Sequence, residues 1–216
     1  MLTRLKQLGA ALAAVVLMTG SAQAATVIDF QTGSDVGVGG SITWDGTNLI
    51  GSEIPIGALT VFGAPSGNGA YDVSGTATAS EPGSFGSLDF DTAANFITIT
   101  GCVEELGIGT DSGQCQPVTL LSGTFTSWSV SQDGLLNAAG LNTTGGELLA
   151  AIGIDADIPW RFFGFSMTAD DLQPNGEPVG VISTDIKSTP IPEPTTMMLL
   201  GTGLLAAFRA RRRQQA

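Results

Sequence analysis

Short apolar runs, interrupted by clusters of turn-forming residues, dominate the chain between residues 25 and 189. In a run such as 96–100 (Phe-Ile-Thr-Ile-Thr), apolar and polar side chains alternate, which places them on opposite faces of a β-strand. Glycine is abundant, with 30 among 216 residues, and Gly, Pro, Asn and Asp separate the runs at sandwich-like spacing. We therefore predict an all-β domain, a sandwich or jelly roll, with strands in 27–30, 42–44, 59–61, 71–78, 96–100, 124–130, 161–167 and 179–186.

Two short segments depart from this alternation and predict helix. Asp133 is suited to cap a short helix over 135–139, which Gly140 would end. Residues 147–152 predict a further turn of helix. We expect these one or two helices to cover an open end or edge of the sandwich.

The charged residues are unevenly distributed along the chain. All 20 acidic residues lie between Asp29 and Glu193, and in that stretch only Arg161 and Lys187 are basic. Lys187 falls at the start of 187–195, the expected linker after the domain. A surface this acidic repels phosphate backbones, so we predict no nucleic-acid partner.

The chain contains no histidine. This absence removes the Ser-His-Asp and Cys-His arrangements of hydrolases and every histidine-ligated zinc or iron site. We therefore expect the domain not to be an enzyme and to carry no cofactor, with calcium as the one possible exception.

Cys102 and Cys115 are the only cysteines, with twelve residues between them. In an oxidising compartment, such an even pair predicts a disulfide that closes a small loop. Two free, buried thiols remain the alternative, because sequence does not give their geometry.

Four aspartates form two pairs with the spacing of neighbours on one face of a strand. They are Asp89 with Asp91, and Asp155 with Asp157. Three interpretations stay open: solvated turn and edge acids, weak calcium ligands, or the acid and base of a glycosidase.

Three tryptophans, Trp44, Trp128 and Trp160, lie in different predicted strands or next to them. They favour core packing, although a set exposed together would suit stacking on sugar rings.

The first 24 residues have the pattern of a secretory signal peptide. A basic start precedes the apolar stretch 8–18, and Ala22 and Ala24 supply the small residues that signal peptidase accepts before a cut at Ala25. A retained membrane anchor is the alternative, for which the apolar stretch is short.

The last 27 residues, 190–216, combine three elements in a fixed order. Pro192, Glu193 and Pro194 come first, followed by the apolar segment 195–208, and then by the basic residues Arg209, Arg211, Arg212 and Arg213. As a helix the apolar segment would span ~21 Å, less than the ~30 Å hydrocarbon core, so it is marginal as a permanent anchor. The arginines should stay cytoplasmic and stop translocation.

This arrangement resembles the PEP-CTERM sorting signal over residues 192–213. The resemblance implies that an exosortase recognises Pro192, Glu193 and Pro194 and removes the apolar tail after transient tethering in the inner membrane. It also implies a Gram-negative host that makes exopolysaccharide, with delivery to the cell surface or extracellular matrix. An ordinary C-terminal anchor with a proline-rich stalk is the alternative.

These observations together predict a non-enzymatic surface or matrix protein. Its expected partners are signal peptidase, exosortase, the membrane before tail removal, and extracellular polysaccharide. The alternatives are a secreted glycan-acting enzyme that uses Asp or Glu pairs, and a calcium-stabilised, lectin-like carbohydrate-binding module.

Overall fold

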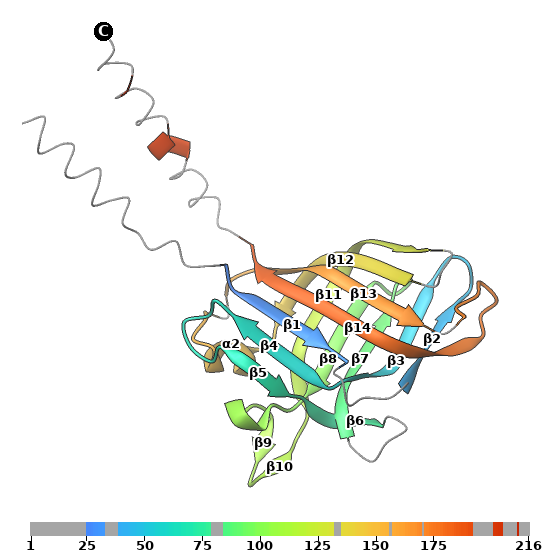
Figure 1. Cartoon of the computed structure of the whole chain (residues 1–216), viewed down its shortest axis with the longest axis horizontal. Helices are drawn as coiled ribbons and strands as arrows, with labels where there is room; N and C mark the ends of the chain where they lie inside the picture. Colours follow the sequence, from blue (N-terminus) through green and yellow to red (C-terminus); the bar gives the residue numbers. More distant parts are fainter. Residues whose placement is uncertain are drawn as a thin grey trace, which may run out of the picture.

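A computed structural model describes residues 25–32, 39–78, 84–131, 135–155, 157–169, 171–191, 201–204 and 211. Most of the body in these ranges is β-strand, arranged as a sandwich-like fold (Figure 1). The predicted all-β sandwich is confirmed.

Twelve strands form one antiparallel sheet. They are β1 (Val27–Gln31), β2 (Gly39–Trp44), β3 (Leu49–Ile56), β4 (Ala58–Phe62), β5 (Gly69–Asp72), β6 (Ser74–Thr78), β7 (Ser84–Asp91), β8 (Phe96–Gly101), β11 (Val118–Val130), β12 (Leu135–Thr144), β13 (Trp160–Ala169) and β14 (Pro178–Pro190). The order is β13-β12-β11-β8-β7-β3-β2-β14-β1-β4-β5, β6 pairs with β7, and β13 also pairs with β14. That last pairing closes the sheet into a ring, from which β1, β4 and β5 branch.

The long strand β14 is the junction between the ring and the branch. One of its edges pairs with β13 along most of its length. The other edge is shared: Pro178 and Val179 pair with β2, whereas Asp185 and Lys187 pair with β1. The first and last strands of the body therefore lie side by side.

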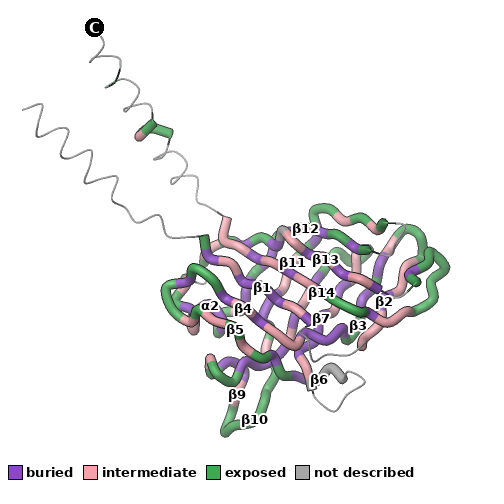
Figure 2. The backbone as a smooth tube through the Cα atoms, viewed as in Figure 1, coloured by how far each residue is buried: buried purple, intermediate pink, exposed green. Residues whose placement is uncertain are grey.

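Every second residue along most strands points inward, and these inward side chains form the core. Figure 2 shows buried and more exposed residues succeeding one another along the sheet. Four phenylalanine rings contact one another in this core, with centroids 5.6–6.4 Å apart and mostly edge-to-face: Phe90, Phe125, Phe162 and Phe165. This is the preferred geometry of aromatic rings in a core.

The tryptophans contribute to the same core. Trp160 is buried, and Trp44 and Trp128 are partly buried and pack against the core cluster. Core packing, rather than a shared exposed platform, is the role that the structure gives them.

One predicted helix is wrong. Residues 135–139 belong to β12, in which Leu136 and Ala138 are buried and their neighbours face outward. This two-residue alternation lets β12 form a hairpin with β11, and the pairing outweighs the helix propensity of leucine and alanine. Asp133, the predicted cap, lies outside the described residues.

The second predicted helix is present as α2 (Gly146–Ala151), which buries Leu148 and Leu149. The expected linker is shorter than predicted, because β14 continues through Lys187 to Pro190. A small satellite follows β8: the 3-10 turn η1 (Glu104–Leu106) and the two-stranded sheet of β9 (Thr110–Asp111) and β10 (Gln114–Cys115).

Candidate functional site

The two ends of the described body lie together. Strands β1 and β14 are antiparallel, with Ile28 opposite Ser188, so the start of one adjoins the end of the other. The Thr189 hydroxyl donates a hydrogen bond of 2.9 Å to the carbonyl oxygen of Thr26. Figure 1 shows the chain entering and leaving the domain at the same end. The predicted signal-peptidase site and the sorting tail are therefore joined to one end of the domain.

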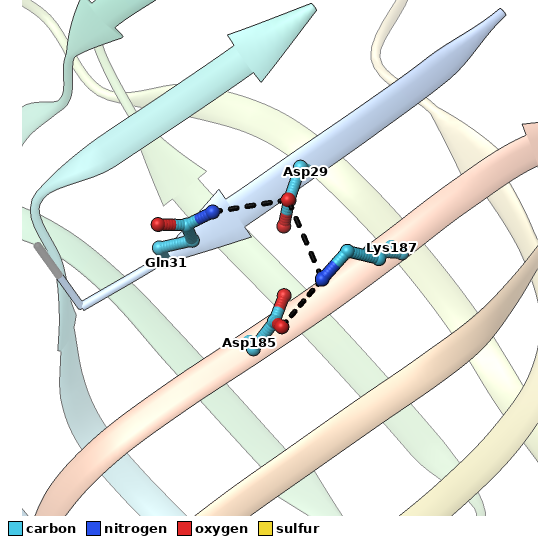
Figure 3. Close-up of polar contacts among 4 residues, drawn as sticks. All are labelled: Asp29, Gln31, Asp185 and Lys187. Carbon is cyan, nitrogen blue, oxygen red and sulfur yellow. Dashed lines mark hydrogen bonds and ion pairs between the residues drawn. The ribbon is translucent and has the colours of Figure 1, made fainter.

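Four polar residues on the outward face of these two strands form what we call the seam cluster: Asp29, Gln31, Asp185 and Lys187 (Figure 3). Asp29 is the cross-strand partner of Lys187, and Gln31 that of Asp185. Lys187 Nζ lies 3.5 Å from Asp29 Oδ2 and 2.5 Å from Asp185 Oδ2. Gln31 Nε2 donates to Asp29 Oδ2 at 3.0 Å.

Burial differs sharply within the seam cluster. Asp29 is only 5% exposed, although it faces away from the core formed by Ile28 and Phe30. The side chains of Lys187 and Asp185 are 37% and 38% exposed. Asp29 is therefore shielded from solvent, whereas Lys187 and Asp185 beside it are accessible.

The burial of Asp29 is the main cause of its shifted pKa. Desolvation, assisted by a hydrogen bond with Asp185, raises the pKa of Asp29 from 3.8 to about 6, against the opposing effects of Gln31 and Lys187. The hydrogen bond to Asp185 raises the pKa of Lys187. The cluster therefore holds a lysine ammonium beside a buried carboxyl, that of Asp29, which takes up a proton more readily than an ordinary aspartate.

Two carboxylate oxygens of the seam cluster lack a donor among the residues described. Asp29 Oδ1 and Asp185 Oδ1 are both buried and unpartnered when each acid is ionised. Protonation of Asp29, which its hydrogen bond with Asp185 favours, would supply a donor between the two carboxyl groups.

The sequence analysis missed this cluster. Two signals were present: Asp29 interrupts the apolar run of β1, and Asp185 and Lys187 are two apart and so share a strand face. Their meeting depends on the pairing of the first strand with the last, which sequence periodicity does not give.

The predicted pair Asp89 and Asp91 lies on one face of β7, but each carboxylate serves its own neighbours. Asp89 accepts hydrogen bonds from the Glu53 backbone N–H at 2.9 Å and the Ser87 hydroxyl at 2.7 Å. Asp91 accepts two backbone N–H groups, at 2.7 and 2.9 Å, from the turn that follows β7. Asp89 therefore stabilises the backbone of the neighbouring strand β3 at Glu53, and Asp91 stabilises the turn after β7.

The second predicted pair lies in a loop. Asp155 accepts a 3.0 Å hydrogen bond from the backbone N–H of Asp157, and both residues are exposed. Within the part of the chain that the structure describes, no group of three or more His, Cys, Asp or Glu side chains is placed to hold a metal ion.

The predicted disulfide is confirmed. Cys102, buried at the end of β8, bonds to Cys115 in the exposed strand β10, with their Cα atoms 5.7 Å apart. Beside it, the backbone N–H of Gly109 donates to Glu147 Oε2 at 2.9 Å, which connects this loop to α2.

The predicted processing residues lie largely outside the described residues. These are Ala22 and Ala24, Pro192, Glu193 and Pro194, and Arg209, Arg212 and Arg213; Arg211 is described and exposed. Of the predicted membrane segment 195–208, residues 201–204 are helical. No helix among the described residues is long and apolar enough to cross a membrane.

Comparison with known proteins identifies the tail. A PEP-CTERM protein-sorting motif matches residues 190–213, beginning at the last residue of β14, the strand that carries Lys187. No curated protein and no solved structure matches the chain. The chain is therefore an exported, surface-directed protein that carries a PEP-CTERM sorting motif for exosortase.

Proposed function

We propose that the domain is a non-enzymatic structural or interaction protein of the cell surface or extracellular matrix, associated with exopolysaccharide. The sorting motif at residues 190–213 is the observation that carries this proposal, because it directs the chain to the surface where such polymers are found. On this proposal the tail tethers the chain transiently in the inner membrane before exosortase removes it.

The arrangement of the chain ends supports a role in presentation. Because β1 and β14 are neighbours, both chain ends leave the domain at one end, and the opposite end of the domain lies away from this attachment point. A domain held in this way exposes its binding surface while the tail is still engaged.

One face has the chemistry for a neutral glycan. Strands β11 and β12 contain no charged residue, and their exposed positions include Thr124, Thr126, Asn137 and Thr143. Hydroxyl and amide groups on the outer side of these strands can exchange hydrogen bonds with sugar hydroxyls without the desolvation cost of charges. We place polysaccharide contact on this β11–β12 face.

Deletion of residues 190–216 tests the sorting part of the proposal. Fractionation should find the full chain at the cell surface or in the matrix and the shortened chain in the periplasm. Equal surface delivery of both forms would contradict the proposal.

Co-sedimentation with exopolysaccharide purified from the host tests the binding part. The double variant T124E/T143E places two charges on the neutral face and should lower the bound fraction at least several-fold, whereas T47E, in an exposed turn, serves as the matched control. Equal binding by all three proteins would remove the β11–β12 face from the proposal, and shortening of the polymer by the wild type would contradict the non-enzymatic role.

A further inference from the structure

We propose that Lys187 and Asp29 become joined by an amide bond between Nζ and the side-chain carbonyl carbon, with Asp185 as the proton acceptor. The bond would link the first strand of the domain covalently to the last. It is independent of the polysaccharide role and of tail removal.

The contacts of Lys187 carry this proposal. Its Nζ is within 3.5 Å of an oxygen of the Asp29 carboxyl group, across directly paired positions of two adjacent strands. The carboxyl carbon that the amine would attack is bonded to this oxygen. Groups held next to each other in this way gain much of the entropic advantage of an intramolecular reaction. The pairing of β14 with both β1 and β13 fixes the backbone of the lysine.

The partners also differ in the way that amide formation requires. The electrophile must be a neutral carboxylic acid, and Asp29 is the buried member, 5% exposed, whose desolvation favours its protonated form. The nucleophile must be a neutral amine, and the ammonium of Lys187 contacts the Asp185 carboxylate at 2.5 Å. Proton transfer along that contact generates the amine, although the same hydrogen bond favours the charged form of the lysine and should make the step slow.

The step balances without an oxidant, a reductant or an energy source. The amine attacks the carboxyl carbon of Asp29, the carbon–oxygen bond to the hydroxyl breaks, and water leaves with a proton supplied by Asp185. Of the four protons that the acid and the ammonium bring, one stays on the amide, two leave in water, and one remains on Asp185 or passes to solvent. Closure of the site over Asp29 opposes the reverse attack by water.

The chain offers a direct assay, because Lys187 is the only lysine after Lys6 in the predicted signal peptide. The exported protein should be lighter than its sequence by one water molecule, after allowance for the disulfide. A lysine-specific protease should fail to cut the reduced, denatured chain at Lys187, since an acylated lysine is not a substrate. Peptide mass spectrometry should then find a branched peptide that joins β1 to β14.

Three variants separate the proposal from other losses of water. K187R retains the positive charge but should restore the full mass. D29N should form the same amide with loss of ammonia in place of water, so its mass deficit identifies the leaving group. D185N should lower the linked fraction at least tenfold, and linkage at the wild-type level in this variant would overturn the role of Asp185.

The proposal fails if the wild-type chain has its full mass and is cut at Lys187. It also fails if K187R shows the same loss of water as the wild type, because the loss would then arise elsewhere. The D29N variant protects the test against misfolding of K187R, since it keeps both reacting positions. A linked D29N chain has lost ammonia and also yields the branched peptide, which a chain that has only cyclised at residue 29 does not.

Discussion

The seam between β1 and β14 and the loop closed by Cys102 and Cys115 join parts of the chain in opposite ways. The disulfide closes a loop with a sequence separation of 13, around a 3-10 turn with no buried residues and two strands of two residues each. The seam joins strands from the two ends of the domain, already held by backbone pairing and a shared core. The loop buries Val103 and Ile108 in the core, so the disulfide adds a link between this packed base and the exposed strand β10. The seam cluster instead adds a side-chain connection between two strands that are already paired.

The variant K187R should have the largest effect on stability, because it removes the proposed amide link across the β1–β14 seam. A covalent link between Asp29 and Lys187 closes about 160 residues of chain, and in the loop-entropy description such a closure stabilises by about 5 kcal/mol. The wild type should therefore unfold at a higher urea concentration than K187R, with D29N close to the wild type because it retains the link. Equal midpoints for wild type and K187R would leave the seam as an ordinary ion pair.

Loss of the disulfide should have the next largest effect. The double variant C102A/C115A opens a short loop and should lose about 3 kcal/mol of unfolding free energy. The damage should be local, because Val103 and Ile108 keep the base of the loop in the core while β9 and β10 are largely exposed. Cleavage by a glutamate-specific protease at Glu104 or Glu105 should accelerate in this variant. An unchanged cleavage rate would mean that packing alone orders the loop.

The same contrast explains how far the sequence could predict the structure. Strand β8 was predictable because apolar and polar residues alternate from Phe96 to Thr100 and the isoleucines and threonines among them are β-branched. The disulfide was predictable because only two cysteines exist. Strand β12 was not predictable, since its leucines and alanines favour helix and become strand only through pairing with β11. Local preference was overruled by tertiary pairing.

The seam cluster lies beyond prediction for a related reason. Asp29 and Lys187 are at opposite ends of the domain, and their contact requires the register that pairs Ile28 with Ser188. A shift of one residue would place Asp29 opposite a residue of the inward face, so the cluster depends on the whole sheet. The sorting tail is the opposite case, because its motif is read from consecutive residues.

A smaller effect should appear as pH dependence in K187R, in which Asp29 stays free to titrate. The pKa of Asp29 is raised to about 6 from 3.8, so between these values the folded state holds a proton that the unfolded state releases. Stability therefore falls as pH rises through this interval, by about 2 kcal/mol after allowance for solvent screening at the open side of the cluster. The facing charges are Asp185 and residue 187, and Thr60 on β4 is uncharged.

Urea unfolding at pH 4.5 and 7.5 measures this dependence. K187R/D29N is the matched control, because it removes the titrating group while the other acids remain, and the difference between the two variants isolates Asp29. A difference that is the same at both pH values would show that Asp29 is not protonated in the folded state.

The smallest effect on stability is expected at Gly164, a residue of β13 that lies against the side chain of Lys187. A Cβ added at Gly164 on β13 would lie 3.4 Å from Cβ of Lys187 and 3.6 Å from its Cδ, which is ordinary contact with a flexible side chain. G164A should therefore change the unfolding free energy by no more than about 0.5 kcal/mol, with a gain if lower entropy of the unfolded chain prevails. G140A is the matched control, because its Cβ would lie 2.0 Å from the Thr124 carbonyl oxygen and must displace backbone. If G164A instead unfolded as readily as G140A, the lysine would be held too rigidly at the seam to move toward Asp29, and the amide would have to form before β13 pairs with β14.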